Sequence, residues 1–255
     1  MMRLFTVSNI SVSMSSILIK GLLPLLSILV YPVVAQELII AAAADLAPLE
    51  RKLADGFSAE TGLNIKFSFG SSGMLARQVA NGAPFDVYLS ANEGFVEELR
   101  AGGQLDPATI RSYATGRLGL WSADGKIKKL SDLLVLRSIA MANPRHAPYG
   151  MAAEQLLRSE GSFGRLQPRL VLAENVRQAF EFARTGNADA VITAWSLVFD
   201  KGGILLPDSG HKPIRQTGGV VKGSRNATAA KRFMDFIAGP KGQAILLAGG
   251  LFPPK

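Results

Sequence analysis

The sequence predicts an α/β protein made of two units, each a doubly wound sheet flanked by helices. Short apolar runs alternate with segments whose apolar residues recur at helical spacing, which is typical of strands joined by helices in a mostly parallel sheet. This alternation begins again after Tyr113 without any repeat of sequence. The chain has 255 residues, 48% of them hydrophobic, which is enough for two modest cores.

The first unit begins with a continuous apolar run at residues 38–43, which is typical of a buried strand. Apolar residues from Leu46 to Phe57 then recur at helical spacing, and Thr61-Gly62 closes that helix. Asp45 stands where an N-cap belongs, because its carboxylate could accept from an amide one turn further on. Further strands are expected at residues 65–69 and 85–90, and further helices from 74 to 80 and from 93 to 101.

The second unit follows the same rhythm. Strands are expected at residues 118–121, 138–142, 170–172 and 190–194, with helices beginning near Gly150 and at Val176. A last strand near residues 218–221 and two helices, 227–237 and 243–248, end the chain.

Residues 1–35 have the pattern of a signal peptide. Arg3 and Lys20 are their only charges, an apolar stretch follows Lys20, and Val33-Val34-Ala35 offers compact residues at the positions that signal peptidase reads. We expect cleavage after Ala35 and export to the periplasm. The alternative is a transmembrane anchor, but the apolar run is short and contains prolines.

The composition excludes several classes of protein. There is no cysteine, so disulfides, thiolate metal sites and a cysteine nucleophile are ruled out. The net charge of +8 falls by two, for Arg3 and Lys20, to +6 in the processed chain. These cations are scattered rather than clustered with aromatics, so we expect no nucleic-acid binding and at most a mild steering of anions.

Several turns between a strand and a helix share one design. Ala44-Asp45, Gly70–Gly73, Ala147–Gly150 and Glu174–Val176 each offer small or neutral polar residues at the start of a helix. In a parallel sheet these turns lie along one edge, where ligands bind. A helix N-terminus offers free amides and a partial positive charge, so the pattern predicts an anion site. Each turn alone could equally be ordinary capping, and Tyr149 could be a packed aromatic.

Together these turns resemble segments of a known protein family. Gly70-Ser71-Ser72-Gly73-Met74-Leu75-Ala76-Arg77-Gln78 resembles a region of the periplasmic molybdate-binding proteins of ABC transporters, the ModA-like solute-binding family. So do Gly116–Ser122, Asn143–Gly150, Glu174-Asn175-Val176 and Gly239-Pro240-Lys241, in the same order along the chain. The resemblance implies a type II periplasmic-binding-protein fold with a ligand cleft between two lobes. It implies one lobe from residues 36–115 and 206–255 and a second from residues 116–205.

The resemblance also implies the ligand and the residues that hold it. Molybdate or tungstate would be bound by neutral hydrogen-bond donors, with no direct metal ligand, no cofactor and no catalysis. The partners would be the permease and ATPase subunits of an ABC importer, and the protein would be a monomer. The expected oxyanion-binding residues are Ala44, Asp45, Ser71, Ser72, Tyr149 and Val176.

The sequence departs from the family pattern at Asp45 and at Ala194. Family members usually carry a neutral donor in the place of Asp45, and a carboxylate facing a dianion would repel it. We therefore expect Asp45 to turn away from the ligand and cap its helix, while the loop amides still reach the anion. Tyrosine stands in the place of Ala194 in one branch of the family only.

Two other functions remain open at the level of sequence. The same fold could bind a different small anion or a polar organic solute, which would give Asp45 a partner. An exported hydrolase could use Ser72 and His146, but Gly-Ser-Ser-Gly is not the Gly-x-Ser-x-Gly nucleophile elbow. His146 is more simply a polar loop residue beside the cleft.

Overall fold

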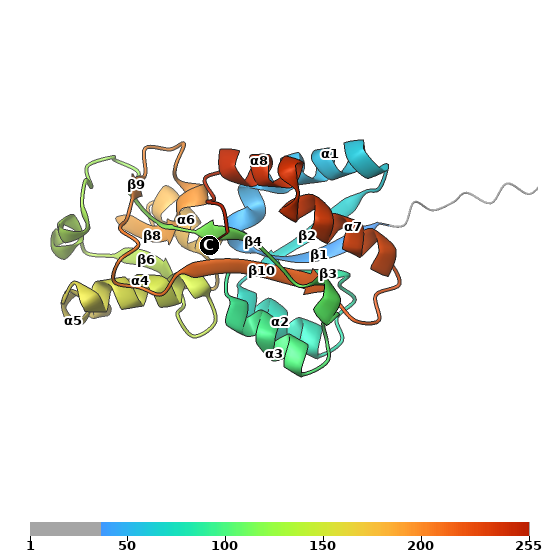
Figure 1. Ribbon diagram of the computed structural model, residues 1–255. Coiled ribbons are helices and arrows are strands. Elements are labelled where there is room, and N and C mark those ends of the chain that lie inside the picture. The colour runs from blue at the N-terminus through green and yellow to red at the C-terminus, as the bar shows by residue number, and fades with distance from the viewer. Residues whose placement is uncertain (1–36, 255) are drawn as a thin grey trace, which may run out of the picture. The chain divides into compact units, whose positions relative to one another are not determined.

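The computed structural model describes residues 37–254 and contains two five-stranded sheets flanked by helices (Figure 1). The expected signal peptide and its cleavage site lie outside the described residues. The first sheet has the order β2-β1-β3-β10-β4 and the second has the order β7-β6-β8-β5-β9. The strands of the first sheet are β1 (Leu38–Ala43), β2 (Ile65–Gly70), β3 (Val87–Ser90), β4 (Arg111–Gly116) and β10 (Ile214–Val220). Those of the second are β5 (Leu118–Trp121), β6 (Ile139–Ala142), β7 (Leu170–Ala173), β8 (Ala190–Ala194) and β9 (Ile204–Leu205).

Helices cover both faces of the first sheet. Those on one face are α1 (Glu50–Thr61), α7 (Ala227–Ala238) and α8 (Pro240–Ala248), and those on the other are α2 (Ser72–Ala80) and α3 (Glu93–Ala101) (Figure 1). The first face is closed by aromatic packing, in which the rings of Phe57 and Phe233 meet edge to face with centroids 5.4 Å apart. The second face is packed by aliphatic residues such as Leu75, Val79 and Leu99.

The second sheet carries α4 (Pro148–Ser159) and α6 (Val176–Arg184), with the short α5 (Phe163–Leu166) after α4. Its core joins apolar residues of the strands with Leu156 and Leu157 of α4 and Phe180 of α6. The doubly wound α/β prediction is therefore confirmed for both units. None of the helices formed by residues 37–254 has the length and apolar character that crossing a membrane requires.

The sheets are mixed rather than parallel, which corrects the expectation from the sequence. β1, β2 and β3 are parallel, but β10 runs antiparallel to both β3 and β4. In the second sheet β5 is antiparallel to β8 and β9. The reason is connectivity: the chain leaves the first sheet through β4, passes directly into β5, and returns through β10 after completing the second sheet. β4 has no clear apolar run and β9 is only two residues long, and the sequence did not predict either strand.

Candidate functional site

A small cavity lies where the carboxyl ends of strands from both sheets meet the N-termini of helices. Ala43 ends β1, Gly70 ends β2 and Ala91 follows β3, whereas Pro148 and Val176 begin α4 and α6 of the second sheet. The cavity has a volume of only about 10 Å³, because its two sides, one from the first sheet and one from the second, lie close together. The cavity is lined by Ala43, Ala44, Gly70, Ser71, Ser72, Ala91, Ala147, Pro148, Tyr149, Asn175 and Val176.

Free backbone amides reach this cavity from three helices. Ser72 is the first residue of α2, Tyr149 the second of α4 and Val176 the first of α6. Within residues 37–254 none of these three amides donates to an acceptor. Each helix N-terminus also carries a partial positive charge. The cavity therefore combines donors from both sheets in the way that suits a bound anion.

The Ser72 hydroxyl adds a further neutral donor. Ser72 is fully buried, and its Oγ accepts the amide of Ala91 at 3.0 Å. A serine hydroxyl has one proton besides its acceptor lone pairs, so the Ser72 proton remains free to donate. The carbonyl of Ser72 is fixed by the buried hydroxyl of Tyr88, at 2.8 Å. The serine is thus oriented on both sides before any ligand arrives.

Ser71 links the two sides of the cavity. Its hydroxyl lies 2.9 Å from Nδ1 of His146, which precedes α4, and the amide of Gly73 donates to the carbonyl of His146 at 2.9 Å. Partial burial, and then the charge of Arg77, lower the pKa of His146 from its ordinary 6.5, although Glu174 acts in the opposite direction. His146 is a half-buried loop residue, in the place expected from the sequence.

Asp45 does not cap its helix, so that expectation was wrong. The chain enters the 3₁₀ helix η1 (Ala44–Leu49) directly after β1, which puts Ala43 at the N-cap and Asp45 inside the first turn. The Asp45 side chain is fully buried, and Oδ2 accepts from the Tyr149 hydroxyl at 2.8 Å and from Nε2 of Gln216. The side chain is absent from the cavity lining, so it is turned away from the cavity as expected, but toward these partners.

The Tyr149 hydroxyl takes part in the same buried hydrogen-bond network. It donates to Asp45 and accepts from Gln216 at 3.1 Å, while Oε1 of Gln216 accepts from Tyr113 at 2.8 Å. Gly116 allows the ring to lie there, because a Cβ at Gly116 would overlap the hydroxyl. The Tyr149 hydroxyl is therefore engaged away from the cavity, and its backbone amide is the donor left free. Asp45, Tyr149, Gln216 and Tyr113 thus form one buried hydrogen-bonded group, the Asp45 cluster. Its central member, Gln216, was not predicted from the sequence.

The electrostatics of the cluster are set by burial. Desolvation raises the pKa of Asp45 from its ordinary 3.8 to about 6, although the hydrogen bonds from Gln216 and Tyr149 act to lower it. The same burial, with the charge of Asp45, raises the pKa values of Tyr149 and Tyr113 well above 10, so both remain neutral. Oδ1 of Asp45 is buried and has no hydrogen-bond partner among the described residues.

The described residues do not form a catalytic or metal centre here. His146 contacts Ser71 rather than Ser72, and no carboxylate accepts from its ring within residues 37–254, so no triad is assembled. The same part of the chain holds no group of three or more His, Asp or Glu placed to bind a metal ion.

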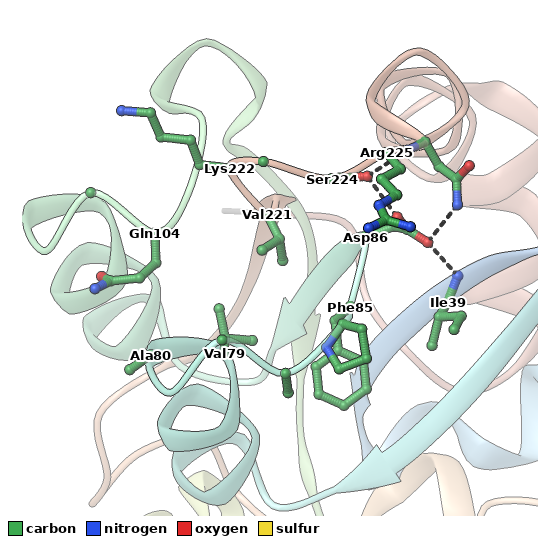
Figure 2. Close-up of a pocket in the computed structure, with 16 residues that line it drawn as sticks. Ile39, Val79, Ala80, Phe85, Asp86, Gln104, Val221, Lys222, Ser224 and Arg225 are labelled. Carbon is green, nitrogen blue, oxygen red and sulfur yellow. Dashed lines mark hydrogen bonds between the residues drawn. The ribbon is translucent and has the colours of Figure 1, made fainter.

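A larger pocket, of about 780 Å³, lies at the opposite end of the first sheet (Figure 2). Its acidic residue, Asp86, accepts from the amide of Ile39 at 2.8 Å, the hydroxyl of Ser224 at 2.6 Å and Nδ2 of Asn226 at 3.1 Å. Asp86 therefore fastens β1 to the segment after β10, and these hydrogen bonds explain its burial without a ligand.

Comparisons with known proteins agree with this fold. The chain is 35% identical to the molybdate-binding protein ModA of Rhodobacter capsulatus, covering 86% of this chain and 89% of that protein. It is 33% identical to ModA of Azotobacter vinelandii, covering 85% of this chain and 90% of the relative. The solved periplasmic molybdate-binding protein of Azotobacter vinelandii superimposes with a TM-score of 0.80 at 32% identity, over 86% of this chain and all of that one. Residues 38–251 match the family described as bacterial extracellular solute-binding protein, and the chain belongs to that family.

Proposed function

We propose that this protein captures molybdate or tungstate in the cavity between its two sheets and delivers it to an ABC importer. The observation that supports this most directly is the set of free amides of Ser72, Tyr149 and Val176 around one buried cavity. Resemblance to proteins named as molybdate-binding supports the identity of the ligand. The importer's permease and ATPase, the periplasmic location, cleavage after Ala35 and a monomeric state belong to the same proposal.

The proposed ligands of the oxyanion are the residues that line the cavity with donors. The amides of Ser72, Tyr149 and Val176 and the hydroxyl of Ser72 would donate directly. Ser71 would donate its hydroxyl if the ligand displaced its contact with His146, and Ala44 would contribute its backbone. Asp45 has a different role, since its side chain is occupied by Tyr149 and Gln216.

The energy of such a site is adequate without a charged side chain. A hydrogen bond to a charged acceptor contributes about 1.5–3 kcal/mol, and several together exceed the roughly 8 kcal/mol of a micromolar complex, even after ordering costs. Molybdate and tungstate are nearly equal in size, so we propose that both bind. Sulfate is smaller and would be held poorly by a fixed ring of donors.

We also propose that the two sheets belong to lobes that close around the ligand, with residues 36–115 and 206–255 in one and 116–205 in the other. Two crossings support this division: β4 passes into β5 through Arg117, and the chain returns between β9 and β10. Two adjacent crossings permit a hinge. The alternative, a polar organic solute that uses Asp45 as its partner, is disfavoured because the Asp45 carboxyl group is occupied by Tyr149 and Gln216 and does not line the cavity.

The test is a melting experiment on the processed protein with molybdate, tungstate, sulfate and phosphate added separately. A ligand that binds only the folded state raises its stability by mass action, by about 2.7 kcal/mol at a concentration 100 times Kd. We expect a large increase in Tm with the first two anions and little with the others. If molybdate and tungstate leave Tm unchanged, while native mass spectrometry finds an organic solute bound, the oxyanion assignment is wrong.

A further inference from the structure

Asp45 is the feature of the site that the proposed function leaves unexplained. It is a fully buried acidic side chain in the chain position next to Ala44, which lines the cavity. A dianion in the cavity would lie close to this carboxyl group, and like charges in a buried site repel strongly. The binding of an anion by neutral hydrogen-bond donors does not require an acidic side chain at this position.

The contacts of Asp45 join the two sides of the cavity. Oδ2 accepts from Tyr149 of α4, and the Asp45 carbonyl accepts from the hydroxyl of Ser196 at 2.8 Å, in the 3₁₀ helix η5 (Trp195–Leu197) after β8. Gln216 of β10 holds the same oxygen from the first sheet. Burial of the carboxyl group therefore depends on the two sides being together, and separating them would return it to water.

No positive charge compensates Asp45 in this closed arrangement. The titratable side chains that face it are Tyr149 from α4 and Tyr113 from β4, both neutral, and its other partners, Gln216 from β10 and Ser196 from η5, do not titrate. Within residues 37–254, no Lys, Arg or His of α1, α6, β2 or any other element forms an ion pair or hydrogen bond with it. One carboxyl oxygen, Oδ1, is buried without a partner.

Resting on the proposed function, we propose that Asp45 couples anion capture to the uptake of a proton: it is ionised when the sides are apart and becomes a neutral acid when they close on the anion. The closed arrangement offers few hydrogen bonds and no cation to an ionised carboxylate, so it favours the neutral form. The pKa of Asp45, which burial raises to about 6 in the closed structure, also favours the neutral form. A dianion in the cavity would raise that pKa further.

The sign of the pH effect follows from linkage. The closed state holds the proton more tightly than the open state, so closure is favoured as the pH falls through the closed-state pKa. With a pKa of 3.8 for the exposed group and about 6 for the closed one, anion affinity falls about fourfold from pH 5.5 to pH 8. The further effect of the bound anion makes this a lower bound. With these pKa values, binding should take up about 0.1 proton at pH 7 and about 0.7 proton at pH 5.5, and the charge of the bound anion should increase both fractions.

The experiment is calorimetric titration of the processed protein with molybdate at pH 5.5, 6.5 and 8, in pairs of buffers that differ in ionisation enthalpy. We expect the affinity to fall by fourfold or more across this range and the heat to depend on the buffer, which reports proton uptake directly. Asp45→Asn should abolish both effects, because asparagine keeps an oxygen for Tyr149 and Gln216 but does not titrate. Asp55→Asn, which removes the same charge from the exposed surface of α1, should behave like the parent protein.

The possible results distinguish a failure of the proton coupling from a failure of the proposed function. Tight binding without pH dependence or proton uptake would overturn the coupling and leave the proposed function intact. An Asp45→Asn variant that keeps the full pH dependence would assign the proton elsewhere, and His146→Asn would then identify its source. No molybdate binding by the parent protein and both aspartate variants at any pH would overturn the proposed function itself.

Discussion

At the scale of single residues, the side chain of Ser72 has two roles at once. Its Oγ accepts from the amide of Ala91 while its proton stays available to the cavity. Ser72→Ala would remove both, so we expect a loss of about 10- to 100-fold in molybdate affinity and about 1–3 kcal/mol in stability, from the orphaned amide of Ala91. Calorimetry and urea unfolding measure the two effects separately.

Ser71→Ala is the matched control for that prediction. Its hydroxyl contacts only His146, which is half-exposed and can turn to water. We expect little loss of stability in this variant, and a smaller loss of affinity than in Ser72→Ala. Equal effects of the two substitutions would contradict the separate roles assigned to these serines.

The sequence could predict which single residues gather at the cavity but not what Asp45 does. Ser71, Ser72, Tyr149 and Val176 each follow a strand and begin a helix, so their convergence follows from the carboxyl-edge rule for parallel strands. Gln216 lies 171 positions from Asp45, in a strand whose antiparallel register decides which of its side chains reaches Asp45. No local pattern carries that information.

At the scale of elements, the cavity depends on how firmly each helix N-terminus is fixed. The Asn175 side chain accepts from the amide of Gln178 at 3.0 Å and so caps α6, whose first amide, that of Val176, is free. Asn92 caps α3 in the same way, by accepting from the amide of Gly94 at 2.7 Å, but it does not line the cavity. These two caps form a matched pair.

Asn175→Ala and Asn92→Ala should each cost about 1 kcal/mol in stability, the usual cost of losing an N-cap. Only Asn175→Ala should also weaken molybdate binding, by several-fold, because the amide of Val176 would no longer be held in place. Thermal unfolding and calorimetry on both variants provide the measurement. Weaker binding in both variants would mean that affinity follows stability rather than the position of α6.

The start of α4 is fixed by close packing instead of a side-chain cap. Gly150 lies against the end of β6, where a Cβ would overlap the carbonyl of Ala142. Gly150→Ala should therefore displace α4 and the amide of Tyr149, with a stability loss of about 1–3 kcal/mol, typical of overpacking, and a marked loss of molybdate affinity. Gly164→Ala is the control: a Cβ there meets nothing within 4 Å, so stability should change by less than about 1 kcal/mol.

Most of the helices and central strands could be predicted from hydrophobic periodicity, because these elements bury one face or both. The direction of β10 and the existence of β4 could not. β10 (Ile214–Val220) contains Arg215, Gln216, Thr217 and two glycines, so it lacks an apolar run and acquires its strand conformation by pairing with β3 and β4. The mixed sheets therefore follow from long-range connectivity, which local patterns do not record.

At the scale of the whole molecule, the Asp45 cluster connects charge to stability even without a ligand. Tyr149 and Ser196 contact Asp45 from the second sheet's side and Gln216 from the first, so unfolding exposes the carboxyl group to water. Its pKa then falls from about 6 to 3.8. A raised pKa in the folded state means that the acid contributes stability at low pH, and that this contribution is lost as the pH rises through about 6.

The unfolding free energy should therefore separate the parent protein from Asp45→Asn in a pH-dependent way. With the two pKa values above, the parent gains about 1–2 kcal/mol relative to the variant on going from pH 8 to pH 5. Urea unfolding at both pH values, without molybdate, gives this double difference, in which any pH-independent cost of the asparagine cancels. Asp55→Asn, exposed on α1, should show no such change relative to the parent. A double difference of zero for Asp45→Asn would mean that the carboxyl group stays ionised inside the folded protein, and proton uptake on closure would then lose its physical basis.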